Sequence, residues 1–123
     1  MRLPARDERV THAIEDAVNW LRRVQLTGIR LQRVPADTAE FEFHTTDFDV
    51  IVVHDEEATL LWARHYEIGS DRPVFAGRNA VTRYALSEIE RERRTGTPWY
   101  GDWPRALLGE EYPRWRKSRA AVR

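Results

Sequence analysis

The longest unbroken apolar run in the chain is residues 50–53, VIVV, within the stretch 47–68. Consecutive β-branched side chains favour a strand whose two faces are both partly covered. The acidic residues 55–57 interrupt the apolar pattern, which returns at Leu60, Leu61 and Trp62. The stretch therefore predicts a β-hairpin with an acidic turn, and its first strand is predicted to be central in the sheet.

Two segments carry apolar residues at helical spacing. Residues 8–25 predict an amphipathic helix that stops before Gly28. A second helix is predicted to begin at Asn79, as its N-cap, and to end at Gly96. The buried stripes would be Val10, Ile14, Ala17, Leu21 and Val24 in the first helix and Val81, Ala85, Leu86 and Ile89 in the second.

Three further segments have the alternating pattern or the composition of strands. Residues 29–34 and 39–44 alternate apolar and polar side chains, and residues 73–76 predict a short edge strand, where proline costs least. Short connections between strands favour antiparallel pairing. The predicted pairs are Phe43 with Phe48, Ile51 with Trp62, and Asp49 with Arg64 as an ion pair.

These elements predict an α+β fold: a single antiparallel β-sheet of about five strands, flanked by an N-terminal and a C-terminal helix. A chain of 123 residues is long enough for one core. The predicted core residues are Trp20, Phe41, Phe43, Val50, Val52 and Ile89.

The last part of the chain differs in composition from the rest. Residues 97–123 hold three of the five tryptophans together with three prolines. They predict an irregular, aromatic-rich extension packed on a core domain of residues 1–96. Its tryptophans would either cover Ile51 and Trp62 on the open face of the sheet or contact a partner.

Composition sets limits on the environment of the protein. It has no cysteine, no apolar stretch long enough to cross a bilayer and no N-terminal apolar signal core, which predicts a cytoplasmic protein without disulfides. Twenty basic residues balance twenty acidic ones, so nucleic-acid binding is not expected. The charge is uneven, because residues 34–57 hold eight acids and no Lys or Arg.

Candidate catalytic and metal-binding groups are sparse. His12, His44, His54 and His65 do not form a spaced ligand set, no serine lies in a GxSxG motif, and no glycine-rich phosphate loop is present. Acidic residues on the face of an open sheet have no cleft that would raise a carboxyl pKa for acid catalysis. The sequence therefore predicts a non-enzymatic binding protein with no cofactor and no metal.

Two short segments carry a resemblance to a known family: AVNWLR at residues 17–22 and VTRYAL at residues 81–86. With the order of helices and strands, they resemble the small immunity proteins of actinobacterial polymorphic toxins, such as the immunity factor of the tuberculosis necrotizing toxin, an NAD glycohydrolase. The resemblance implies a cytoplasmic inhibitor that blocks a cognate toxin, an NAD glycohydrolase or a nuclease, by direct contact.

The predicted partner-binding surface combines the acidic stretch with neighbouring aromatic residues. Secretion-chaperone-like and YbjN-like proteins, which bind a client segment as dimers, are the alternative, and the chain is expected to be a monomer or a homodimer. A small enzyme that uses the acidic face is a third possibility. The predicted contact residues are Glu40, Glu42, Asp49, Asp55, Glu56, Glu57, Trp62, Arg64, Trp99 and Trp103.

Overall fold

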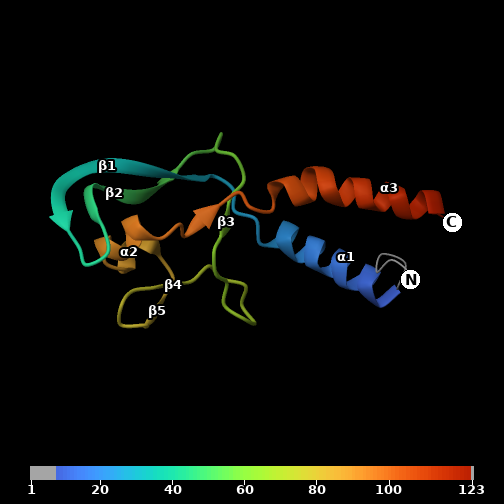
Figure 1. Cartoon of the computed structure of the whole chain (residues 1–123), viewed down its shortest axis with the longest axis horizontal. Coiled ribbons are helices and arrows are strands. Elements are labelled where there is room, and N and C mark those ends of the chain that lie inside the picture. Colours follow the sequence, from blue (N-terminus) through green and yellow to red (C-terminus); the bar gives the residue numbers. More distant parts are fainter. Residues whose placement is uncertain (1–7, 123) are drawn as a thin grey trace. The chain divides into compact units, whose positions relative to one another are not determined.

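The computed structural model describes residues 8–122, with side chains described as far as residue 119 (Figure 1). The chain divides into two compact units. Residues 26–101 form one, called the central unit, and the described residues 8–25 and 102–122 form the other, called the terminal unit. The boundary expected at residue 96 stays a prediction.

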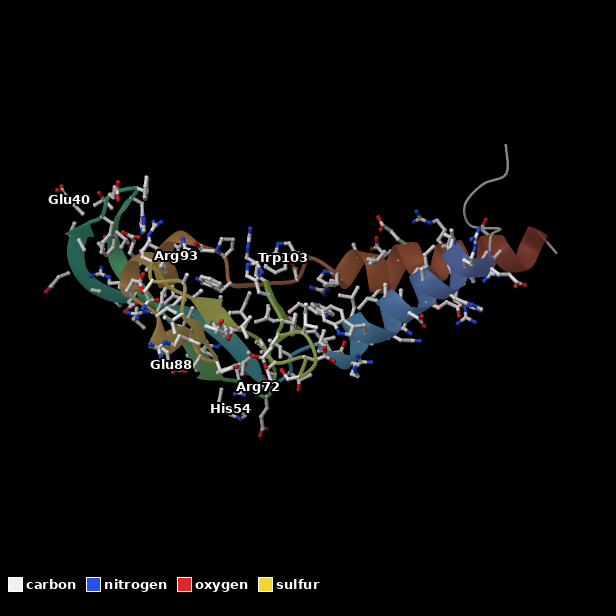
Figure 2. The ribbon with its side chains drawn as sticks, turned by 90° about the horizontal axis from the view of Figure 1, so that it is seen from below. Glu40, His54, Arg72, Glu88, Arg93 and Trp103 are labelled. Carbon is white, nitrogen blue, oxygen red and sulfur yellow. The ribbon has the colours of Figure 1, made fainter. Side chains whose placement is uncertain are left out.

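Two helices form the terminal unit. The first, α1 (Glu8–Arg23), confirms the helix predicted from periodicity and buries Thr11 and Val18. The second, α3 (Tyr112–Val122), follows a π-helical turn, η3 (Leu107–Glu111), and lies beside α1 in Figures 1 and 2. Glu15 and Arg119 join the helices by an ion pair of 3.6 Å.

The irregular tail predicted for residues 97–123 is therefore wrong over α3. Its tryptophans and prolines suggested a break in structure, yet most of the remaining residues are good helix formers. Pro113 is accommodated directly after the π-helical turn, where the regular hydrogen bonds to the fourth preceding residue are already interrupted.

A long antiparallel hairpin organises the central unit. It pairs β1 (Ile29–Glu40) with β2 (Thr45–His54), and Leu31 faces Val52. The predicted end of the first strand at Pro35 is wrong, because an irregularity between Pro35 and Ala39 accommodates the proline within β1.

The turn of this hairpin lies at residues 41–44, where the Phe41 N–H donates to the His44 carbonyl at 2.8 Å. Phe48 consequently faces Pro35 of β1, so its predicted pairing with Phe43 is wrong. The predicted second hairpin is also absent, because Trp62 pairs with Gly101 instead of Ile51.

The remaining strands are short pairs. β3 (Trp62–Ala63) pairs with β6 (Tyr100–Gly101), and β4 (Phe75–Ala76) pairs with β5 (Thr82–Arg83). The α+β class is confirmed, but the described residues form three two-stranded antiparallel sheets and not a single sheet of five strands.

The second predicted helix is mostly wrong. Its first half holds β5 and a 3₁₀ turn, η2 (Leu86–Glu88), and only α2 (Arg91–Gly96) is helical. The Asn79 side chain accepts a hydrogen bond from the Val81 N–H at 3.1 Å, which forms a tight turn and caps no helix. The predicted end at Gly96 is confirmed.

The core of the central unit gathers around Phe75 and Trp99, which are 2% and 5% exposed. Leu86 and Ile89 complete it, and the predicted burial of Ile89 is confirmed. Phe43 was predicted to lie in this core but is 69% exposed, because it stands in the turn of the β1–β2 hairpin. Val52, at 39% exposed, is likewise not a core residue.

Candidate functional site: an arginine-rich surface of the central unit

Three extended segments lie side by side in the part of the central unit that follows β3. Residues 65–67 run antiparallel to residues 72–74, with Tyr66 opposite Pro73 and the Val74 N–H donating to the His65 carbonyl at 3.1 Å. Residues 72–74 form the middle segment and continue along the chain into β4. The edge of the middle segment that faces away from residues 65–67 pairs with β5 through β4. Phe75 fixes the middle segment to the core through ring contacts with Trp99 at 5.6 Å and Tyr100 at 5.5 Å.

Four exposed arginines project from these segments and their loops, and we call them the arginine surface: Arg64, Arg72, Arg78 and Arg83. No described residue pairs with the guanidinium of Arg64 or Arg83. Arg64 directly precedes the first segment and Arg83 lies on β5. These two segments flank the middle one, so they are two strand spacings, about 10 Å, apart. The surface therefore presents two positive charges, on nearby segments, that no described residue compensates.

Arg72 belongs to a connected polar cluster. Its guanidinium lies 3.7 Å from the centre of the Tyr84 ring, and the Tyr84 hydroxyl donates to the Glu67 carboxylate. The Ser70 hydroxyl also donates to Glu67, at 2.6 Å. The hydrogen bonds from Ser70 and then Tyr84 lower the pKa of Glu67, and the bond to Glu67 raises the pKa of Tyr84. Glu67 thus stays ionised and holds Tyr84 and its stacked arginine in place.

Arg78 lies over a second aromatic ring. Its guanidinium is 5.0 Å from the Phe43 ring centre and forms an ion pair with Glu92. The backbone N–H of Arg78 donates to the Glu90 carboxylate at 2.6 Å, and this hydrogen bond lowers the pKa of Glu90. Gly77 makes this approach possible, because a Cβ at this position would clash with the Glu90 carboxylate. A hollow of about 440 Å³ borders Arg78; its lining includes Phe43, His44, Glu92, Arg93 and Thr95.

A fifth arginine is structural. The Arg94 guanidinium donates to both oxygens of Asp49, at 2.9 and 2.8 Å, and also to the Ile89 carbonyl. The hydrogen bond from Arg94 lowers the pKa of Asp49 against the effect of burial, and the same bond raises the pKa of Arg94. The predicted ion pair of Asp49 with Arg64 is therefore wrong, since Asp49 is occupied by a residue of α2.

The Asp49–Arg94 pair also borders a cavity of about 560 Å³. Its lining includes Val50, Tyr84, Ser87 and Tyr100. Burial raises the pKa of Tyr100 to about 12, so this hydroxyl is a hydrogen-bond donor at neutral pH. Polar groups and an apolar strand face thus meet beside the arginine surface.

The described residues contain neither a cluster of metal ligands nor a helix able to span a membrane. Between residues 8 and 122, no three or more His, Cys, Asp or Glu side chains are placed to hold one metal ion. The helices in that part of the chain are too short or too polar to cross a membrane.

Comparison with known proteins identifies the family. The model of the pectic acid lyase family matches residues 1–108. The chain belongs to this family. No curated protein matches it.

Among solved structures, the chain is similar to a family 10 polysaccharide lyase from Cellvibrio cellulosa, with a TM-score of 0.59 and 21% identity over 83% of this chain. A mutant of the family 10 lyase from the same organism, in complex with trigalaturonic acid, matches with a TM-score of 0.58 and 22% identity over 80% of this chain. These likenesses show a shared fold. The chain spans 28% of the length of either structure.

Membership of the pectic acid lyase family overturns the functional prediction. The immunity-protein resemblance, the non-enzymatic assignment, the chaperone-like alternative and the protein-toxin partner are all wrong. The resemblance depended on an order of elements and two six-residue segments, and the structure shows that this order was partly incorrect, because residues 81–86 are a short strand followed by a turn.

The predicted contact residues do not form one surface of the central unit. Figure 2 shows Glu40 at the turn of the β1–β2 hairpin, well away from Arg72. Asp55 pairs with Arg30 at 3.1 Å. Trp62 and Trp99 are buried, and Trp103 belongs to the terminal unit. Arg64 belongs to the arginine surface. The remaining residues, Glu42, Glu56 and Glu57, are exposed in turns.

Three members of the arginine surface were missed in the sequence. Arg72, Arg78 and Arg83 lie in residues 72–87, a stretch without a single Asp or Glu. The basic stretch is a detectable signal, although the eight acids of residues 34–57 form the more conspicuous charge cluster. Whether any of the predicted residues contacts a ligand stays a prediction.

Proposed function

We propose that this chain contributes to a lyase that acts on pectic acid, a polymer of galacturonate, and that its arginine surface binds the carboxylates of the polymer. The observation that supports this most strongly is that the guanidinium groups of Arg64 and Arg83 are exposed and have no partner among the described residues. A galacturonate chain carries one carboxylate on each sugar. Guanidinium groups match carboxylates in shape and charge, and can bind them through two parallel hydrogen bonds.

Lyase chemistry on a uronate gives such arginines a role beyond binding. A proton leaves the ring carbon that carries the carboxylate, and its electron pair forms a double bond to the neighbouring ring carbon. The bond from that second carbon to the glycosidic oxygen breaks, and the oxygen takes up a proton. Negative charge builds up on the carboxylate as the first proton leaves, so fixed positive charges beside it lower the barrier.

The proposed contribution of this chain is therefore orientation and charge. Arg64 and Arg83 would hold the carboxylates, while Tyr84 and the stacked Arg72 would shape the neighbouring wall. No base is assigned to the chain, which spans 28% of the length of the solved lyases. The cytoplasmic location expected from the sequence also stays a prediction.

Replacing Arg64 and Arg83 by alanine tests the proposal. Each substitution should weaken binding of a galacturonate tetramer about tenfold, because a charge-assisted hydrogen bond contributes roughly 1.5 to 3 kcal/mol. The affinity of the double variant for the tetramer should be no higher than that of the single variant with the lower affinity. Isothermal titration calorimetry at low salt, repeated at rising salt concentration, measures the loss and its electrostatic part.

Arg30→Ala is the matched control, because it removes the same charge from β1, where Arg30 already pairs with Asp55. Its affinity for the tetramer should stay within about twofold of the parent. Equal binding by the parent protein and the double variant would contradict the proposed role of the arginine surface.

A further inference from the structure

A hollow of about 590 Å³ lies on the terminal unit, at the start of its C-terminal helical segment. Trp103 forms one wall and is 52% exposed, so its indole is accessible to a ligand. The other lining residues are Asp102, Arg105, Ala106, Gly109 and Glu110. The hollow shares no residue with the arginine surface.

The backbone around the hollow is well defined. The Arg105 N–H donates to the Asp102 carbonyl, and the Leu108 N–H donates to the Pro104 carbonyl, both at 2.9 Å. These bonds fix the turn that holds Trp103, which Figure 2 labels. The π-helical turn η3 then widens the helix, a feature that often marks functional sites. A Cβ at Gly109 would meet nothing within 4 Å, so this side of the hollow is open.

The lining combines an aromatic face with hydrogen-bonding groups. We propose that the hollow binds one neutral hexose residue of a polysaccharide, with its apolar C–H face stacked on the Trp103 indole. The carboxylates of Asp102 and Glu110 would accept hydrogen bonds from sugar hydroxyls, and the Arg105 guanidinium would donate one. None of these three side chains has a partner among residues 8–119.

Charge determines the class of sugar. Two carboxylates against one guanidinium leave a net negative charge around the hollow, which repels the carboxylate of a uronate. A neutral hexose presents only hydroxyls at the same positions. This binding is independent of the proposed role of the arginine surface, because the two sites have different residues and opposite charge.

Titration of the full chain, labelled with ¹⁵N, tests this assignment. The probes are a galactose tetramer and a galacturonate tetramer, which differ in having a hydroxymethyl group or a carboxylate on each sugar. The galactose tetramer should shift the indole N–H signal of Trp103 in a saturable manner. Trp103→Ala should weaken this binding by about tenfold, and Glu110→Gln by a few fold.

Leu107→Ala is the control, because Leu107 is an exposed apolar residue of the same turn that does not line the hollow. It should leave the affinity for the galactose tetramer within about twofold. If Trp103→Ala fails to fold, Glu110→Gln alone decides, since its side chain is exposed. A Trp103 signal that does not respond to the galactose tetramer, unchanged affinity in Trp103→Ala or Glu110→Gln, or tighter binding of galacturonate at this signal would overturn the proposal.

Discussion

Truncating Phe75 to alanine is expected to lower the free energy of unfolding by about 3 to 5 kcal/mol. Phe75 is 2% exposed and its ring contacts Trp99 and Tyr100 at 5.6 and 5.5 Å. Removing the ring takes away buried apolar area and leaves a cavity that the packed neighbours cannot fill. Phe75 also anchors the middle segment, which lies between the segments that carry Arg64 and Arg83. The substitution should therefore disorder the arginine surface as well. Urea unfolding followed by circular dichroism measures the change.

Phe43→Ala is the matched control, with the same chemical change in the same unit. Phe43 is 69% exposed and its main contact is the Arg78 guanidinium. The expected loss is below about 1 kcal/mol, the size of one exposed cation–π contact. Equal losses for Phe43→Ala and Phe75→Ala would show that the core does not centre on Phe75.

Breaking the Asp49–Arg94 pair has the second largest expected effect. The two side chains are 23% and 18% exposed, so the pair is largely shielded from water. Asp49→Asn or Arg94→Met should each cost about 2 to 4 kcal/mol, because the remaining charge is left partly buried without its partner. Urea unfolding at pH 7 measures the loss, with Glu57→Gln as an exposed control expected to change stability by less than about 0.5 kcal/mol.

The same pair predicts a pH dependence. The pKa of Asp49 lies below its ordinary value of 3.8 in the folded protein, chiefly because of the hydrogen bond from Arg94. Its contribution to stability is therefore complete above pH 3.8 and disappears as the pH falls through the lowered folded value. The Asp49→Asn variant should lose this part of the acid dependence, so the difference in stability between parent and variant should shrink below pH 3.8. A difference that stays constant down to the acid transition would contradict the assignment.

Local patterns in the sequence identified some elements correctly. The spacing of Val10, Ile14 and Leu21 predicted α1, because a helix needs only its own periodicity to be recognised. The apolar run at residues 50–53 correctly predicted a strand within β2. Both are properties of one continuous segment and do not depend on a partner.

Pairing was predicted less well, because it depends on where the chain turns. The predicted pair of Phe43 with Phe48 places the turn between these two residues. Moving the turn to residues 41–44 changes the partner of every residue in β2. The spacing of Val81, Ala85, Leu86 and Ile89 also imitated a helix. Leu86 and Ile89 are buried in the core, but Leu86 lies in the 3₁₀ turn and Ile89 directly follows it. Val81 is 45% exposed. Tertiary packing overrode the local preference there.

The candidate site was hidden for a similar reason. Arg64 and Arg83 are 19 positions apart in the sequence, and only the folded segments on either side of residues 73–75 bring them near each other. The acidic stretch was conspicuous in the sequence, yet the structure uses Asp49 and Asp55 to pair with arginines of the fold. Two of the eight acidic residues in that stretch are therefore structural.

The most direct measurement compares the affinity of the chain for polygalacturonate with its affinity for the fully methyl-esterified polymer. Both have the same sugar backbone, but esterification removes the negative charge of each carboxylate. If the arginine surface binds carboxylates, the acidic polymer should bind at least about tenfold more tightly at low salt, and the advantage should fall as salt rises. Equal affinity for the two polymers, or no binding of the acidic one, would contradict the proposed function.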